Sequence, residues 1–164
     1  MAVAARWIHL HLPHLEAMPA VCAAFARVQA PGSMPAVLWG SGEELRHALA
    51  IVAPLKHLPG RSTRWRSWAL APLVATYRRC GLSAYFDSDR ICLSGQPISG
   101  IEATTIGACA VIITEFTAWG VDFMDALRAR IEAQHSWQFD NSWPGAIERD
   151  AIAEALLGVV ADAR

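Results

Sequence analysis

Residues 84–116 read AYFDSDRICLSGQPISGIEATTIGACAVIITEF, and this stretch decides which folds the chain can adopt. Strand-like pieces lie over 82–86, 90–93 and 98–103, and Ser94-Gly95-Gln96-Pro97 is typical of a hairpin turn between the last two. An apolar run rich in β-branched residues follows over 108–116 and predicts a central strand. The stretch therefore predicts several consecutive strands of one sheet.

The N-terminal third supplies alternating strands and helices. Apolar and polar residues alternate over 6–12, which predicts a strand buried on one face. A helix is expected over 15–29, and a short strand over 35–39. Apolar residues at helical spacing then predict a helix over 43–52 that buries Leu45, Leu49 and Val52.

Three further helices are expected. The third helix of the chain carries Leu70, Leu73, Val74 and Tyr77, accepts Pro72 only in its first turn and ends at Gly81. Asp122 is expected to cap a helix that buries Phe123, Leu127 and Ile131, and the last helix buries Ile152, Leu156, Val159 and Val160. The order of elements predicts an α+β (mixed α/β) fold, with helices packed on a central mixed or largely antiparallel sheet in one domain over 1–164.

Composition excludes a disordered chain, because 54% of the 164 residues are hydrophobic and only 18% are charged. No uncharged run approaches the roughly 18 apolar residues that a membrane-spanning helix needs. Histidines and a proline interrupt the apolar stretch after Arg6, unlike a signal peptide. The sequence therefore predicts a cytoplasmic protein without a membrane partner.

Charge is distributed unevenly along the chain, although the net charge is only −1. Residues 45–86 hold seven cations and no acid, whereas residues from 102 onward hold ten acids and four arginines. Two interpretations stay open: the arginines pair internally with the acidic third, or they form a surface that binds an anion. A single lysine and a near-neutral pI argue against a nucleic-acid partner.

Isolated histidines and cysteines offer few other sites. His9 and His11 project from one strand face and His14 follows, yet no further ligand lies near except Glu16, so we predict no metal site. The four cysteines lack paired spacing and are expected to be buried thiols, namely Cys22, Cys80, Cys92 and Cys109.

The stretch 84–116 resembles the central segment of the catalytic domain of biotin and lipoate protein ligases. Ser88-Asp89 stands where that family has Asn-Asp, and 95–100 stands at its G-x-K-[IL]-[SA]-G turn; residues 6–8 and 34–39 are similar to the opening of lipoate ligases. The resemblance implies a compacted class II synthetase-like fold with a cleft lined by Asp89, Ser99 and Gly100. If the hairpin is the family's, Gly100 lies at a close backbone approach, and valine there would cost roughly 1–3 kcal/mol.

The departures from the family concern its chemistry. Pro97 stands in the lysine slot of the turn, and the only lysine of the chain is Lys56. Residues 60–68 resemble the arginine- and glycine-rich nucleotide loop of biotin ligases, which makes Arg61 and Arg64 candidate anion contacts, but two of its glycines are replaced. The resemblance thus implies a degenerate member without adenylation activity.

Three hypotheses for function follow. The first is a degenerate ligase-like protein that binds a lipoyl, octanoyl or biotinyl-like acyl compound or its carrier protein. The second is an active acyl ligase or acyltransferase that uses arginine in place of lysine, with ATP and Mg²⁺ as the only cofactors implied. The third is an unrelated interaction protein. Because Trp119, Trp137 and Trp143 lie outside the clearest cores, a homodimer is also expected.

Overall fold

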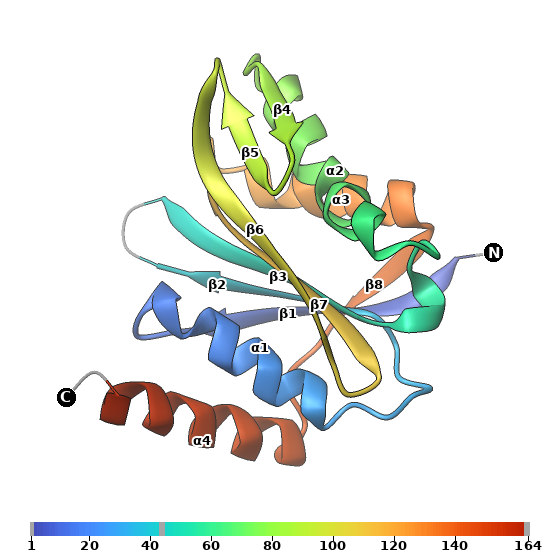
Figure 1. Ribbon diagram of the computed structural model, residues 1–164, viewed down its shortest axis with the longest axis vertical. Coiled ribbons are helices and arrows are strands. Elements are labelled where there is room, and N and C mark those ends of the chain that lie inside the picture. Colours follow the sequence, from blue (N-terminus) through green and yellow to red (C-terminus); the bar gives the residue numbers. More distant parts are fainter. Residues whose placement is uncertain (1, 43–44, 163–164) are drawn as a thin grey trace.

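Eight strands form one sheet in the computed structural model, which describes residues 2–42 and 45–162 (Figure 1). The strands follow one another across the sheet in the order β4-β5-β6-β7-β3-β2-β1-β8. β1 is parallel to both β2 and β8, and every other neighbouring pair is antiparallel. The bounds are β1 Val3–His11, β2 Ala36–Ser41, β3 Arg46–Pro54, β4 Ala84–Asp87, β5 Arg90–Leu93, β6 Gln96–Ile106, β7 Cys109–Thr117 and β8 Trp137–Asn141.

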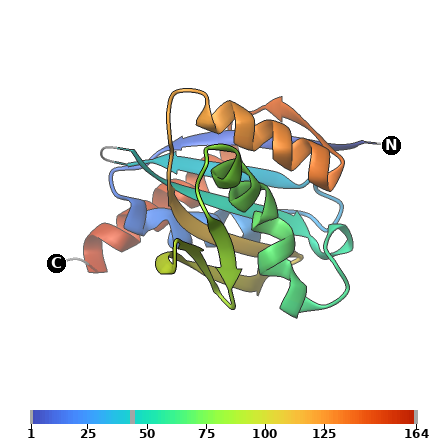
Figure 2. The same ribbon diagram turned by 90° about the horizontal axis from the view of Figure 1, so that it is seen from above.

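Helices cover both faces of this sheet (Figures 1 and 2). One face carries α1 Met18–Arg27, preceded by the 3-10 turn Leu15–Ala17, and α4 Ala146–Asp162; the other carries α2 Trp65–Arg79 and α3 Phe123–His135. Short 3-10 turns at Leu55–His57 and Ser62–Arg64 link β3 to α2. The predicted α+β class with a mixed sheet and packed helices is confirmed.

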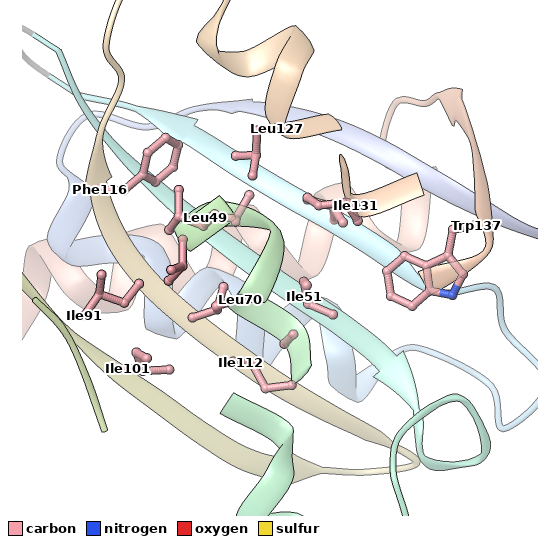
Figure 3. Packing of buried hydrophobic residues seen from close by; sticks show 14 of the residues in the cluster. Leu49, Ile51, Leu70, Ile91, Ile101, Ile112, Phe116, Leu127, Ile131 and Trp137 are labelled. Atoms are coloured by element: carbon pink, nitrogen blue, oxygen red, sulfur yellow. The ribbon is translucent and has the colours of Figure 1, made fainter. Parts of the chain in front are cut away.

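The sheet separates two hydrophobic cores. On the α2 and α3 face, Leu49 and Ile51 of β3 meet Leu70, Leu127 and further residues (Figure 3). On the α1 and α4 face, alternate residues of the same strands pack on Val21, Cys22 and Phe25. Because β3 and β7 are buried on both faces, they read as continuous apolar runs.

β3 corrects the prediction of a helix over 43–52. Arg46–Pro54 is an extended strand between β2 and β7, Leu45 is exposed, and residues 43–44 lie outside the described residues. Leu49 and Val52 are buried, but they point into opposite cores. A continuous apolar run satisfies helical spacing as well as strand spacing, so periodicity alone could not separate the two.

α2 begins earlier than predicted and contains Pro72 in its interior rather than in its first turn. Proline removes one backbone hydrogen bond from a helix. The apolar face of α2, with Leu70, Leu73 and Tyr77 fully buried, holds the helix in place, and the Thr76 hydroxyl donates a 2.7 Å hydrogen bond to the carbonyl oxygen of Pro72. Residues 65–68 of the predicted nucleotide loop are therefore helical.

Two details near α3 also differ from expectation. The Asp122 side chain makes no capping hydrogen bond, and Trp137 lies in β8, a strand that sequence patterning did not predict. Trp137 is 4% exposed, so the expectation that it lies outside the core is wrong. Among the described helices, none combines the length and hydropathy needed to cross a bilayer.

A carboxylate clamp fastens α4 to the rest of the molecule. The Arg6 guanidinium on β1 donates two 2.8 Å hydrogen bonds to the Glu148 carboxylate, which also accepts from the Gln29 side chain and the Gly145 backbone N–H. The Arg6 and Glu148 side chains are only 16% and 13% exposed. Paired geometry of this kind joins β1, the segment just after α1 and the first turn of α4 at one point.

Candidate functional site

A cleft of about 390 Å³ opens on the sheet face that carries α1. It lies between the start of α1 and the strands β3, β6 and β7. Its walls are formed by Leu15, Glu16, Met18, Pro19, Ala48, Asp89, Ile98, Ser99, Gly100, Ile101, Glu102, Ile113, Thr114 and Glu115. We call its apolar side chains the floor; its polar groups come from the turn before α1, the β4–β5 turn and the strands β6 and β7.

Thr114 organises the β6–β7 wall of this cleft. Its side chain is 2% exposed, and its hydroxyl lies 2.9 Å from the Ser99 hydroxyl and 3.0 Å from the Gly100 carbonyl oxygen that it donates to. A buried hydroxyl with these partners fixes the position of the strand beside it. Ser99 and Gly100 are thereby held at the cleft.

A β-bulge in β6 brings Ile98 to the same place. Ile91 pairs with Ser99 and Cys92 pairs with Pro97, which leaves Ile98 without a partner on β5. Ile98 is 41% exposed and lines the cleft, whereas Pro97 is not among the lining residues. Bulges commonly redirect side chains next to binding sites, and this one leaves Ile98 facing the cleft.

Asp89 reaches the cleft from the β4–β5 turn. The Ile101 backbone N–H donates a 2.7 Å hydrogen bond to the Asp89 carbonyl oxygen, which anchors the turn on β6. The structure therefore brings together Asp89, Ser99 and Gly100, three of the five residues expected to bind a ligand. A Cβ added to Gly100 meets no atom within 4 Å, so the expected close backbone approach at this glycine is wrong.

The charge of the cleft is negative. Its described lining includes four carboxylates, from Glu16, Asp89, Glu102 and Glu115, and no lysine or arginine. Arg46 pairs with Glu115 from β3, and Arg90 Nε lies 3.9 Å from Asp89 Oδ1 at an exposed position. Glu16 and Glu102 have no ion-pair partner among the described residues. Their carboxylates would repel an anion that entered the cleft.

Arg46 lies beside this site. It lines a side groove of about 160 Å³ with Pro13, His14, Leu15, Glu16 and Gly42, and Leu15 and Glu16 are shared with the main cleft. Sequence analysis placed Arg46 in a helix, so its position beside the cleft was missed. Thr114 and the carboxylates of β6 and β7 were missed because only the folded sheet brings them to one place.

Arg61 and Arg64 lie elsewhere. They belong to the segment that leads into α2 on the opposite face of the sheet, and both are exposed. Arg64 lines a separate groove of about 280 Å³ with Pro59, Ser67 and Trp68. The structure does not bring these arginines to the cleft.

Internal pairing neutralises little of the basic span. Of its seven cations, Arg46 alone forms an ion pair with the acidic third among the described residues. Arg66 and Arg78 instead donate to the carbonyl oxygens of Ile101 and Ala84, at 3.2 and 2.8 Å. Arg61 and Arg64 remain open to an external anion.

The N-terminal histidines form an aromatic stack on the α2 and α3 face. The His9 ring lies parallel to Trp39 with centroids 3.7 Å apart, and His11 is 4.5 Å from His9. Burial, helped by the neighbouring His11 and His47, lowers the pKa of His9. Over residues 2–42 and 45–162, no cluster of three or more histidines, cysteines or carboxylates has the arrangement of a metal site.

Two of the four cysteines are unreactive thiols, and one cysteine differs from its predicted burial. Cys22, Cys92 and Cys109 are buried as predicted, but Cys80 at the end of α2 is exposed, which corrects the expectation for that residue. Burial raises the pKa of the Cys22 and Cys109 thiols. A raised pKa keeps a thiol protonated and unreactive.

Comparison with solved structures identifies the fold. A bipartite lipoate protein ligase from Thermoplasma acidophilum, described with its E2 lipoyl domain, matches with a TM-score of 0.77 at 10% identity over 94% of this chain and 92% of its own. Lipoate-protein ligase A bound with ATP matches at 0.76 and 12% identity, over 93% and 94%. The biotin acetyl coenzyme A carboxylase synthetase from Helicobacter pylori, with bound biotinylated ATP, matches at 0.53 and 12% identity, over 93% and 81%.

The chain thus has the fold of lipoate and biotin protein ligases, as the resemblance implied. Neither protein-family models nor the sequences of curated proteins match it.

Proposed function

We propose that this chain binds a lipoyl, octanoyl or biotinyl-like acyl group in the cleft while that group is attached to a carrier, without activating it as an adenylate. The observation that carries the proposal is the lining of the cleft, which combines an apolar floor with four carboxylates and, within the part of the chain that the structure describes, no cation.

The floor suits an acyl chain. Leu15, Met18, Ala48 and Ile113 present apolar side chains along a volume of about 390 Å³. Clefts of roughly 300–1,000 Å³ with apolar walls and few polar groups are typical of small-ligand sites. An extended aliphatic chain would bury its methylenes at about 0.8 kcal/mol each.

The carboxylates select against a free acid. Two like charges 4 Å apart repel by about 1 kcal/mol in water and more strongly beside a protein surface. A free acyl acid or an acyl-adenylate carries negative charge into this cleft, whereas an acyl amide or thioester is neutral. The neutral forms are those in which a carrier holds the acyl group.

ATP and Mg²⁺ do not fit the residues present. Phosphate groups require cations or a glycine-rich cradle of backbone N–H groups. Among the described residues, neither lysine, arginine nor Pro97 lines the cleft, and the arginine segment of 61–68 runs into α2 on the other face. We therefore assign no step to a nucleotide.

A carrier protein is the partner that this reading requires. The lipoate ligase from Thermoplasma acidophilum is described with its E2 lipoyl domain, which supports a carrier domain as the partner here. Arg61 and Arg64 are exposed and free of ion pairs within the described chain, so they remain candidate anion contacts for an acidic partner surface separate from the cleft.

The test compares lipoamide with lipoate, which share one acyl chain and differ in charge. Lipoamide is expected to raise the melting temperature, because a ligand at about 100 times its Kd stabilises the native state by about 2.7 kcal/mol. Lipoate is expected to bind at least about tenfold more weakly, which corresponds to about 1.4 kcal/mol. The double variant Glu16→Gln, Glu102→Gln should narrow this difference. Equal or tighter binding of lipoate would refute the proposal.

A second prediction concerns Gly100. Gly100→Val should leave the free energy of unfolding within about 0.5 kcal/mol of the parent, since its Cβ meets no neighbour and valine suits a strand. The added side chain enters the cleft and should weaken lipoamide binding at least about tenfold. Calorimetric titration measures the affinity, and thermal melting checks the fold. Unchanged affinity in a stable variant would place the acyl group elsewhere.

An active ligase remains the second candidate, because Arg46 adjoins the cleft and could replace the missing lysine. Under our proposal, neither lipoate nor biotin supports exchange of labelled pyrophosphate into ATP. Pro97→Lys should not restore exchange, since residue 97 does not line the cleft. Exchange by the unmodified protein that disappears in Arg46→Ala would establish the second candidate instead.

A further inference from the structure

β1 continues beyond the end of β8, its neighbour at the margin of the sheet. β1 runs to His11, whereas its pairing with β8 ends at Trp7. The Ser142 N–H donates a 3.0 Å hydrogen bond to the Trp7 carbonyl oxygen, and the two-residue repeat of a parallel ladder makes residue 144 the next donor. Residue 144 is a proline, which has no N–H, so β8 cannot extend its pairing along β1.

The main-chain groups of His9 and His11 point toward this free margin. Val3 and Trp7 form hydrogen bonds with the segment of β8, at 2.8 and 3.0 Å, whereas the Arg6 N–H donates to the segment that leads into β2. Because main-chain groups alternate in direction along a strand, the odd-numbered residues face the β8 side. Within the described residues, the N–H and C=O groups of His9 and His11 have no hydrogen-bond partner.

The two outermost strands of the sheet are treated differently, because side chains cap their outer edges. On β8, the Phe139 N–H donates to the Glu132 carboxylate and the Phe139 carbonyl oxygen accepts from Arg128, both at 3.1 Å. On β4, the Ala84 carbonyl oxygen accepts from Arg78 at 2.8 Å. Such caps prevent another chain from pairing with a sheet edge. The free end of β1 lacks a cap of this kind among the described residues.

An apolar groove of about 230 Å³ lies between this free end and α4. Its apolar walls include Leu10 of β1 and Ile152, Ala153 and Leu156 of α4. Side chains of a strand alternate between the two faces of its sheet. Every second side chain of a strand added at this margin would therefore enter the groove beside Leu10.

The charge of the groove favours a neutral or acidic occupant. Arg149 lines it, is exposed and has no ion-pair partner within the part of the chain that the structure describes. The described lining includes no carboxylate. A basic segment would be repelled by this arginine.

We propose that the free end of β1 binds an extended segment of another protein, which adds one strand to the sheet and places alternate apolar side chains in the groove. The unpaired N–H and C=O groups of His9 and His11 call for an extended backbone as their partner. A helix uses its main-chain groups internally, and a lipid acyl chain has none. The inference does not depend on the proposed function.

A blocked heptapeptide tests the proposal, with leucine at the second, fourth and sixth positions, aspartate at the third and threonine elsewhere. In amide NMR titrations it should bind with a Kd below about 1 mM. At saturation, hydrogen exchange of the His9 and His11 amides should slow at least about tenfold. Lysine in place of the aspartate should weaken binding.

Methylated peptides test the main-chain pairing. Methyl groups on the leucine amides block one edge of the peptide, and methyl groups on the amides between them block the other edge. Only one edge of an added strand faces β1, so one methylated form should bind at least about tenfold more weakly than the other. Equal binding of the two forms would contradict strand addition.

Protein variants locate the site. His11→Pro removes an N–H at the free margin and should weaken peptide binding at least about tenfold, whereas His11→Ala keeps this N–H and should bind like the parent. Ala153→Trp fills the groove and should weaken binding to a similar extent. Thr105→Pro, at an exposed position of β6 beyond its pairing with β5, is the matched control and should leave the affinity unchanged. Thermal melting confirms that the variants fold.

Four further results would overturn the proposal. The first is the absence of peptide binding up to about 1 mM. The second is binding that both His11→Pro and Ala153→Trp leave intact. The third is an equal loss in His11→Ala and His11→Pro, which would assign the contact to the imidazole. The fourth is protection of the His9 and His11 amides that rises with protein concentration alone, which would make a second copy of the chain the occupant.

Discussion

Replacing Glu148 with glutamine is expected to lower the free energy of unfolding by about 2–4 kcal/mol. Removing one partner of a buried pair leaves the other charge without compensation, and measured losses for such pairs lie in this range. Here the Arg6 guanidinium is 16% exposed and would keep only neutral partners. Urea denaturation at neutral pH measures the loss.

The matched control is Glu132→Gln on α3. Glu132 lies 3.7 Å from Arg128, with side chains 32% and 27% exposed, so it should cost less than half as much as Glu148→Gln. A loss below about 0.5 kcal/mol for Glu148→Gln would show that α4 is held by apolar packing alone.

The same clamp predicts loss of stability in acid. Burial opposes ionisation of Glu148, but hydrogen bonds from Arg6, Gln29 and Gly145 outweigh it and lower the pKa to about 2. Its ordinary pKa of 4.5 applies to the unfolded chain, so the stabilisation is complete above pH 4.5 and is lost as the pH falls toward 2. Because solvent screens a partly exposed clamp, we expect a loss of about 1–2 kcal/mol. Glu148→Gln should lack this loss.

The strands over 84–116 could be predicted because their signals are local. The Ser94-Gly95 turn has positive φ at both residues, which suits a two-residue hairpin, and the apolar run of β7 occupies an inner position of the sheet. β3 and β8 could not be predicted in the same way. β3 is apolar on both faces and so lacks alternation, and β8 is short, with a buried Trp137 and Phe139 between polar residues.

The residues of the cleft fall into the same two groups, those with a local sequence signal and those without one. Asp89, Ser99 and Gly100 lie within twelve residues of one another, so the resemblance of one short segment to the ligase family was enough to predict all three. The remaining carboxylates come from the start of α1, from β6 and from β7, and only the register of the sheet places them together. Arg61 and Arg64 show the converse case, because the fold carries their segment to the other face, away from the cleft, and their role as anion contacts stays a prediction.

The parent protein is expected to lose about 2–3 kcal/mol of its free energy of unfolding between pH 6.5 and 4 through His135. Replacing His135 with phenylalanine should abolish this loss. His135 packs between Trp68 and Trp137, with ring centroids at 4.2 and 4.9 Å, and this burial lowers its pKa to about 4 despite a weak contact with the Ala69 carbonyl oxygen. As the pH falls below 6.5 the unfolded chain gains a proton that the native state resists, so stability declines until about pH 4.

Phenylalanine keeps the aromatic packing, so the free energy of unfolding near neutral pH should change little. Because phenylalanine cannot titrate, the free energy of unfolding should fall less steeply between pH 6.5 and 4 than in the parent. Part of the slope should persist, because burial also lowers the pKa of His9 and His47. Glu148→Gln serves as the control, since its effect on the pH dependence lies below pH 4.5. Urea denaturation across pH 3.5–7 separates the two windows, and an unchanged slope in His135→Phe would mean that His135 is protonated within the folded aromatic cluster.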